Sequence, residues 1–381
     1  MAGLMDRPVR PVVSSDDREN TFGSEMRDLR IEAYARLLVE RCVGVQPGWE
    51  VLIRATTLAR PLVEAVIEEI ARCGAQPFLQ LTFEMIGGPF ARTAPIEVLR
   101  EAAPLQRRVW EDCDAIITIS APENTREGSD LSEDRRQALE QRSRPVRRRT
   151  MAMAVPWVIC EYPVQANAQD AGMTLEQMED FVFGAVLLDW DAEAERMARI
   201  AEVFDDASQV RIVGDGTDLT LSVAGRNGII DDGHVNMPGG EVFYSPVEDS
   251  AEGVITFSEF PAVRFGREVY GARLEFEQGR IVNAMARSGE DFLVQTLDTD
   301  EGARRLGELG IGCNPAIQRF TRSVGFDEKI GGTIHLAVGS SYTSNGGKNI
   351  SAVHWDIVKD LRRGGKLFAD GRLVQEDGVW L

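Results

Sequence analysis

The alternation of helical and strand patterns in the first half of the chain constrains the fold more than any other feature. Apolar residues recur there at helical spacing in three stretches, and each stretch leads into a short apolar run of strand length. Strands that alternate with helices of this length form β-α-β units, in which the strands lie parallel in one sheet. The expected helices cover residues 26–43, 62–75 and 95–113, and the expected strands cover residues 50–57, 76–83, 115–120 and 156–163.

The pattern changes near residue 208, after a long or broken helix expected over residues 173–204. Short strand-like pieces separated by Gly and Asp turns follow, which is typical of antiparallel hairpins. One helix is expected to interrupt them at residues 299–310. We therefore predict an α/β fold with a flexible tail over residues 1–25, an N-terminal parallel α/β domain over residues 26–205, and a C-terminal α+β domain with antiparallel strands over residues 206–381.

The charge and the cysteine content exclude several classes of protein. The chain has 42 Lys and Arg against 61 Asp and Glu, a formal net charge of −19, whereas nucleic-acid binding depends on cations that neutralise phosphates. No run approaches the ~18 apolar residues of a membrane span, and the N-terminal segment lacks the apolar core of a signal peptide. The 5 cysteines form no CxxC pair, which is typical of reduced thiols. These features predict a cytoplasmic protein that binds neither nucleic acid nor a membrane.

Two of the three histidines lie close to acidic residues near the C-terminal end. His354 and Asp356 are two positions apart in a strand-like run, so their side chains point to the same face, about 7 Å apart along the strand. His335 lies in an earlier alternating strand. An imidazole and a carboxylate on one face, with a second imidazole nearby, predict a divalent-metal site. His234 is interpreted as a loop residue or as a residue that contacts the metal ligands without binding the metal itself.

Two acidic residues upstream would complete a two-metal site. Glu241 follows a Pro-Gly-Gly turn, and Glu308 is expected near the C-terminal end of the helix at residues 299–310. Each residue also has an ordinary alternative, because either carboxylate could be solvated and either histidine could be a hydrogen-bonded core residue. The sequence lacks HExxH, GxSxG, the P-loop pattern and a Cys-centred zinc pattern. Taken together, the acidic residues and histidines predict a metal-dependent hydrolase.

Five motifs resemble those of the aminopeptidase T/aminopeptidase S family of metallopeptidases. They are YPVQANAQDAGMTLEQMEDF, NMPGGEVFYSP, LGELGIGCNP, FDEKIGGTIHLAVGSSY and ISAVHWDI, in this order. The resemblance implies an N-terminal α/β domain, a C-terminal domain that holds two divalent metal ions, and a homodimer. The chain departs from the family where Gly240 replaces the first of two glutamates, in the longer FDEKIGGTIH, and in HWDIVKD. These departures keep the metal ligands and change positions that would face the substrate.

The resemblance also implies a role for each site residue. The five metal ligands that it implies are Glu241 as the bridge, Glu308 and His335 on one ion, and His354 and Asp356 on the other. Tyr342 would hydrogen-bond the reacting carbonyl. Our candidate general base is Glu328, with Lys329 beside it as a contact for a carboxylate or an oxyanion.

With zinc, cobalt or manganese at both positions, this site predicts an aminopeptidase-like hydrolase. A water activated by two metals would remove the N-terminal residue of a short peptide or cleave a related small amide.

The same fold also resembles 2,5-dihydroxypyridine dioxygenases, so a second enzyme class stays open. In that alternative, His335, His354 and Asp356 would hold one Fe(II) as a set of two histidines and one carboxylate. Glu241 and Glu308 argue against it, because a one-iron enzyme does not need two further carboxylates. A metal-bearing binding protein without catalysis is the third alternative. The number and identity of the bound metal ions would separate the three.

Overall fold

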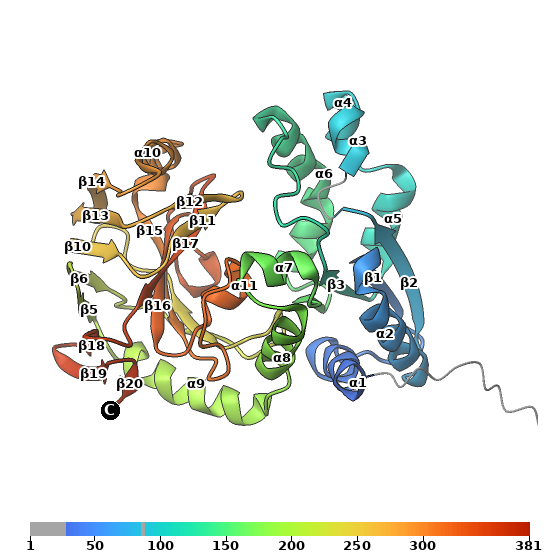
Figure 1. Ribbon diagram of the computed structural model, residues 1–381, viewed down its shortest axis with the longest axis horizontal. Coiled ribbons are helices and arrows are strands. Elements are labelled where there is room, and N and C mark those ends of the chain that lie inside the picture. Colours follow the sequence, from blue (N-terminus) through green and yellow to red (C-terminus); the bar gives the residue numbers. More distant parts are fainter. Residues whose placement is uncertain (1–27, 85–87) are drawn as a thin grey trace, which may run out of the picture.

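The computed structural model describes residues 28–84 and 88–381, which form two lobes (Figure 1). The expected tail at residues 1–25 lies outside the described residues. The N-terminal lobe is built on a five-stranded sheet in the order β2-β1-β3-β4-β8, and every neighbouring pair is parallel, as predicted. Its strands are β1 (Glu50–Thr56), β2 (Gln76–Thr82), β3 (Ala115–Ser120), β4 (Trp157–Glu161) and β8 (Asn236–Met237).

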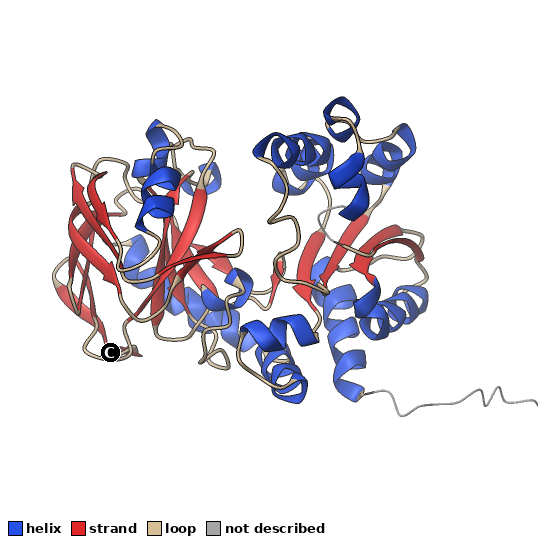
Figure 2. Ribbon diagram, turned by 45° about the horizontal axis from the view of Figure 1, so that its top comes forward, coloured by secondary structure: helices blue, strands red, loops and turns tan. Residues whose placement is uncertain are grey.

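Helices cover both faces of this sheet (Figure 2). On one face, Val51 and Ile53 of β1 share a core with the first helices, and on the other face Leu52 shares a core with Trp110 and Val146. Successive residues of β1 therefore pack against helices on opposite faces of the sheet, which explains why apolar residues follow one another without a break at positions 51–53. The helices of this lobe are α1 (Leu29–Arg36), which continues as the π-helix η1 (Leu37–Val43), η2 (Thr57–Ala59), α2 (Arg60–Arg72), α3 (Gly88–Thr93), α4 (Ile96–Leu99), α5 (Pro104–Asp112), α6 (Glu133–Met151), α7 (Gln165–Asp170), α8 (Leu175–Val186) and α9 (Trp190–Asp205).

Two of the expected helices are broken in the structure. The helix expected over residues 95–113 is divided into α4 and α5, and Pro104 begins the second piece, where its missing N–H costs nothing. The helix expected over residues 173–204 is divided into α8 and α9, and Asp189 caps the second piece by accepting a hydrogen bond from Ala192 N.

The C-terminal lobe is antiparallel, as predicted, and contains an eight-stranded and a five-stranded sheet. Their apolar faces share one core, so the opposite face of the five-stranded sheet is left for polar residues. The five-stranded sheet runs in the order β17-β16-β15-β9-β7, with β7 (Ile229–Asp231), β9 (Glu241–Tyr244), β15 (Leu306–Gly312), β16 (Thr333–Gly339) and β17 (His354–Asp360). The remaining elements are β5 (Gln209–Gly214), β6 (Thr217–Ser222), β10 (Glu252–Phe257), β11 (Ala262–Arg264), β12 (Arg267–Val269), β13 (Ala272–Glu277), β14 (Arg280–Met285), α10 (Glu290–Leu297), η3 (Glu301–Arg304), α11 (Val324–Asp327), η4 (Thr343–Asn345), β18 (Lys366–Ala369), β19 (Arg372–Glu376) and β20 (Val379–Trp380).

The helix predicted over residues 299–310 is wrong. Only the short turn η3 is helical there, and Glu308 lies inside the fully buried strand β15. Glycine alternates with apolar side chains along much of this segment, and glycine is a poor helix former. The apolar residues Leu309 and Ile311 enter the core between the sheets, so the strand period of two prevails over the helical spacing of Leu306 and Leu309.

Strand β8 links the two lobes. It lies in the second half of the sequence, yet it pairs with β4 as the fifth strand of the N-terminal sheet. Helix α9 ends at Asp205, where we predicted the boundary, but the chain returns to the first lobe before it reaches β9. None of the helices in the described part of the chain combines the length and apolar character of a membrane span.

Candidate metal centre

The strand register places the five predicted ligands on one face of the five-stranded sheet. Residues directly opposite each other in an antiparallel pair project to the same side. The pairs that establish this face are Glu241 with Gly312, His335 with Gly310, Glu308 and Asp356 with Ala337, and His354 with Gly339. The face that His354 and Asp356 share, as their spacing predicted, therefore continues across the four strands β9, β15, β16 and β17. It includes Glu308, although the sequence analysis predicted a helix there instead of β15.

Close approaches require glycine at Gly310, in β15, and at Gly240, directly before β9. A Cβ atom added to Gly310 would lie 1.9 Å from the ring of His335, so only glycine leaves room for the imidazole. Gly240 has a φ of 117°, and a Cβ there would lie 2.6 Å from the Cβ of Asn314. Gly240, where the chain departs from the family, therefore permits the backbone conformation that positions Glu241.

Glu308 lies between the two histidines. Its Oε1 is 3.2 Å from Nε2 of His335, and its Oε2 is 3.3 Å from Nε2 of His354. The other ring nitrogens face backbone carbonyls: Nδ1 of His335 is 3.1 Å from the Glu328 oxygen, and Nδ1 of His354 is 2.8 Å from the Ser340 oxygen. Each Nδ1 donates to its carbonyl, which orients both Nε2 atoms toward the acidic residues, as metal-ligating imidazoles require.

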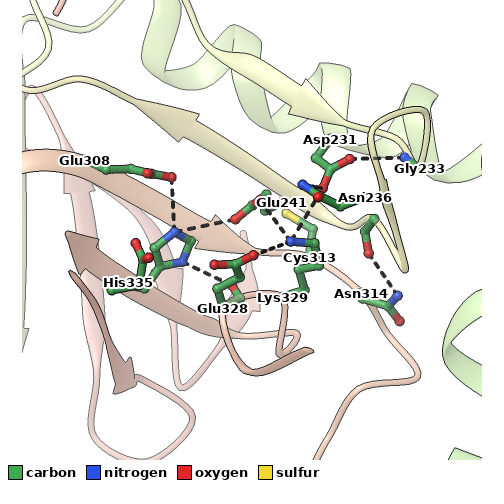
Figure 3. Close-up of polar contacts among 12 residues, drawn as sticks. Asp231, Gly233, Asn236, Glu241, Glu308, Cys313, Asn314, Glu328, Lys329 and His335 are labelled. Carbon is green, nitrogen blue, oxygen red and sulfur yellow. Dashed lines mark hydrogen bonds and ion pairs between the residues drawn. The ribbon is translucent and has the colours of Figure 1, made fainter. Parts of the chain in front are cut away.

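The potential ligand atoms form two groups, each with atoms within 4.8 Å of one another. The inner group is Glu241, Glu328 and His335, and the outer group is Glu308, His354 and Asp356. Figure 3 shows the contacts that run from Glu308 through His335 toward the inner group. Glu328, our candidate base, is thereby placed beside two predicted ligands.

Each group contains a buried carboxylate oxygen without a hydrogen-bond partner. These atoms are Oε2 of Glu241 and Oδ1 of Asp356, and Nε2 of His335 and Nε2 of His354 lie 3.4 Å and 3.6 Å from them. Buried polar atoms are nearly always hydrogen-bonded, so two unsatisfied oxygens on one face require an explanation. These carboxylate and imidazole donors fit a divalent cation in each group.

A buried lysine, Lys329, adjoins the inner group; the sequence analysis predicted it as a contact for a carboxylate or an oxyanion. Nζ of Lys329 is 3.0 Å from Oε1 of Glu241, 2.6 Å from Oε1 of Glu328 and 3.4 Å from Oδ2 of Asp231. Burial opposes the charged amine, but these three carboxylates outweigh it and raise the pKa of Lys329 well above its usual value. Lys329 therefore balances part of the negative charge behind the ligands.

Asp231 carried no signal in the sequence. It ends the three-residue strand β7 and lies opposite Glu241 in the register of β7 and β9. The pairing of β7 with β9 brings Asp231 close to Lys329. His234, in contrast, is exposed and pairs with Asp232 at 2.6 Å, so it is a loop residue away from the ligands.

The charges within the site shift the pKa values of its members. Burial opposes protonated His335, but its hydrogen bond to Glu308 and the charge of that residue raise the pKa of His335 to about 10. Burial also opposes protonated His354, but the groups around it outweigh burial and raise the pKa of His354 to about 9, and its hydrogen bond to Glu308 contributes most to this rise. Burial raises the pKa of Glu241 to about 8, although Lys329 lowers it. Glu308 has a pKa of about 2, because the two imidazoles outweigh the effect of burial.

Metal binding at pH 7 is expected to release roughly two to three protons per chain, because ligands must lose their protons. The raised pKa values mean that His335, His354 and Glu241 hold protons in the metal-free chain at this pH. Metal affinity should accordingly increase as pH rises from 7 through these pKa values. Calorimetry of zinc binding in two buffers of different ionisation enthalpy measures the release. Binding without proton release would contradict this charge arrangement.

Tyr342, for which the resemblance implied a hydrogen bond to the reacting carbonyl, lies beside the outer group. Its ring meets His354 edge to face with centroids 5.3 Å apart, and its hydroxyl is 3.5 Å from Nε2 of that histidine. Burial raises the pKa of Tyr342, so the residue keeps its phenol proton and can donate a hydrogen bond.

A cavity of about 830 Å³, lined by residues of both lobes, reaches the outer group at Asp356. The side chains of His354 and Asp356 are 30% and 13% exposed, whereas that of His335 is 1% exposed. The outer group therefore faces the cavity, and the inner group lies behind it. The volume is within the usual range of small-molecule sites.

Comparisons with known proteins agree with this arrangement. Aminopeptidase 2 of Geobacillus stearothermophilus is 26% identical over 361 residues, covering 83% of this chain and 84% of that protein. Aminopeptidase AmpS of Bacillus subtilis is 26% identical over 380 residues, covering 87% and 89%. Aminopeptidase T of Thermus aquaticus is 36% identical over 152 residues, 35% of each protein. The structure of wild-type AmpT from Thermus thermophilus matches the fold with a TM-score of 0.79 at 24% identity, covering 93% of this chain and 99% of that chain.

These matches confirm the predicted aminopeptidase T/aminopeptidase S resemblance and the prediction of a metal-dependent aminopeptidase. None of these comparisons supports the dioxygenase alternative. The family model described as thermophilic metalloprotease (M29) matches residues 27–380. Because that match spans nearly the whole chain, the protein belongs to the thermophilic metalloprotease (M29) family.

Proposed function

We propose that this metallo-aminopeptidase removes the N-terminal residue of short peptides, or cleaves a related small amide, with one divalent ion in each ligand group. The observation that carries the proposal is the pair of buried, unpartnered oxygens on Glu241 and Asp356, one in each group. Zinc, cobalt and manganese all suit carboxylate and imidazole donors. When bound, such a pair of ions polarises the scissile carbonyl and lowers the pKa of the attacking water.

The geometry favours a different division of the ligands from the one implied by resemblance alone. One oxygen of Glu308 faces each histidine, whereas Glu241 faces His335 and Lys329. We therefore assign Glu308 as the carboxylate shared between the two positions. Glu241 then belongs to the inner group, and Asp356 to the outer group.

The chain's own residues supply the remaining functions. Tyr342 would donate its phenol proton in a hydrogen bond to the carbonyl oxygen as negative charge develops there. Glu328 would accept a proton from the attacking water and deliver it to the leaving amine. Its Oε1 is fixed by Nζ of Lys329 at 2.6 Å, which restricts the carboxylate to the side of the inner group. Access from the interdomain cavity at Asp356 would bring the peptide to the outer group first.

The homodimer and the cytoplasmic location stay proposals. Support for a second copy comes from the edge strand β2, where Phe78, Leu81 and the following Phe83 are 50%, 48% and 75% exposed in the single chain. Apolar side chains on an unpaired edge favour burial against another protein surface. A second copy would remove them from water.

Exhaustive removal of metal is expected to abolish hydrolysis of amino-acid p-nitroanilides and dipeptides. Zinc, cobalt or manganese should restore it, and elemental analysis should find two ions per active chain, because each group offers its own unpartnered oxygen. Full activity in a verified metal-free sample would contradict the proposal. One iron per chain together with oxygen consumption would support the dioxygenase instead.

A further inference from the structure

Arg54 occupies an unusual place in the N-terminal lobe. It lies on β1 near the carboxyl ends of the parallel strands and lines the interdomain cavity. Its register partners are Gln80 of β2 and Thr118 of β3, and Ser120 and Glu161 at the ends of the next strands line the same cavity. In open α/β sheets, ligands bind outside the carboxyl ends of the strands. The lobe opposite the metal centre therefore presents a polar sheet edge to the shared cavity.

Arg54 has no partner within the described part of the chain. Its guanidinium makes no hydrogen bond or ion pair there, and burial alone lowers its pKa, with no carboxylate counteracting the shift. Other arginines of the cavity wall are bonded: Nε of Arg322 is 2.6 Å from Oε1 of Glu268, and Arg126 donates to the Gly266 carbonyl. A half-buried charge without a partner destabilises a fold, so its presence in a cavity wall indicates an external anion.

A second cation without a carboxylate partner lines the same cavity. Nη2 of Arg142 donates to the amide oxygen of Gln106 at 2.6 Å, and Nη1 donates to the Glu101 backbone carbonyl, so these contacts do not neutralise its charge. Burial lowers the pKa of Arg142 as well. Trp110 and Phe90 add apolar lining around these groups. Such a wall suits a carboxylate attached to a small organic molecule.

We propose that Arg54 forms a subsite that binds a carboxylate of the peptide substrate while its amino-terminal end lies at the metal centre. The inference rests on the proposed function, because Asp356 and Arg54 line one cavity of about 830 Å³. The carboxylate comes either from the C-terminus of a short peptide or from an acidic side chain. Arg54 positions the substrate and selects for its charge, and it takes no part in the bond cleavage.

The first test compares each peptide with its uncharged counterpart. Wild-type enzyme should prefer leucyl-glycyl-glycine over its C-terminal amide, or leucyl-aspartyl amide over leucyl-asparaginyl amide, and the pair that differs identifies the source of the carboxylate. In Arg54→Gln the KM for the preferred charged peptide should rise about 10- to 100-fold, the range of a lost charge-assisted hydrogen bond. The kcat, and the KM for the uncharged peptide, should change little.

Two variants serve as controls. Arg54→Lys keeps the charge and should keep part of the preference. Arg60→Gln removes an arginine six positions later that is 79% exposed and pairs with Glu64, and it should leave the preference unchanged. Arg54→Gln should also raise the melting temperature by about 1–3 °C, because it removes a half-buried charge that has no partner among the described residues. A merely structural arginine would lower the melting temperature when replaced.

The second test does not depend on turnover. A reduced-bond leucyl-glycine analogue, with CH2–NH in place of the amide, should bind the wild-type holoenzyme more tightly as the acid than as the C-terminal amide in calorimetry. Arg54→Gln should bind both forms equally. Acid-specific binding by an enzyme that hydrolyses no peptide would support the subsite and reject the proposed function. Hydrolysis with no charge preference in any peptide pair, and equal binding of both analogues by the wild type, would overturn the subsite and leave the function standing.

Discussion

Glutamine in place of Glu308 is expected to lower peptide hydrolysis by about 100- to 1,000-fold, in line with the loss of a central electrostatic group. It should also reduce metal occupancy at both positions. Glu308 faces both histidines and has a pKa of about 2, so it carries its charge at every working pH. Glutamine keeps the size but loses the charge, and its NH2 group can only donate. Metal analysis and steady-state kinetics measure the two effects.

The matched comparisons are Asp356→Asn and Glu241→Gln. Each of these residues belongs to one ligand group, so each variant should lose mainly the ion of its own group. Activity should fall in both, but the occupancy of the other position should be kept. If Glu308→Gln retains two ions while Glu241→Gln loses both, then Glu241 is the shared carboxylate and our assignment is incorrect.

Methionine in place of Lys329 is expected to lower the free energy of unfolding by about 3–5 kcal/mol and to impair metal-dependent hydrolysis. Removing one partner of a buried ion pair leaves uncompensated charge, which is the costly case. Here three carboxylates, those of Asp231, Glu241 and Glu328, would lose a fully buried ammonium. Lys329 lowers the pKa of Asp231 and of Glu241, so both pKa values should rise without it, and the stability deficit should shrink as pH falls and these two carboxylates become neutral. Denaturant unfolding at pH 8 and pH 5 measures this trend.

Lys359→Met is the control for that variant. Lys359 is also fully buried, but it lies on the core face of β17 and bonds only Glu259 among the described residues, at 2.7 Å. The side chain of Glu259 is 28% exposed and can be hydrated once its partner is gone. We therefore expect a smaller loss of stability and unchanged metal content. Equal effects of the two substitutions would show that Lys329 has no special connection to the site.

Local spacing was sufficient to predict that His354 and Asp356 lie on one face of a strand. The two-residue interval between His354 and Asp356 predicts a shared face, and strand β17 provides it. The sheet of the first lobe was also predictable, since β3 covers Ala115–Ser120 as expected. These features depend on periodicity within a single segment, which a sequence displays directly.

Features that depend on non-local pairing were not predictable in this way. The leucine spacing at Leu306 and Leu309 also fits a helix, and only packing between two sheets selects the strand that carries Glu308. Asp231 reaches Lys329 because β7 pairs with β9. Arg54 is an ordinary polar residue in a strand until both lobes surround it and none of the described residues neutralises it.

The short strand β8 has a consequence for anyone who divides or recombines this protein. The segment that ends at Met237 completes the sheet of one lobe, and four residues later the chain supplies Glu241 to the other. A gene fragment that begins after residue 205 would carry β8 without its neighbour β4. An exchange of N-terminal lobes between relatives would have to match β8 to a foreign sheet edge, or the position of Glu241 would shift with it. The folding unit of this enzyme is therefore the whole chain, although its architecture suggests two separable modules.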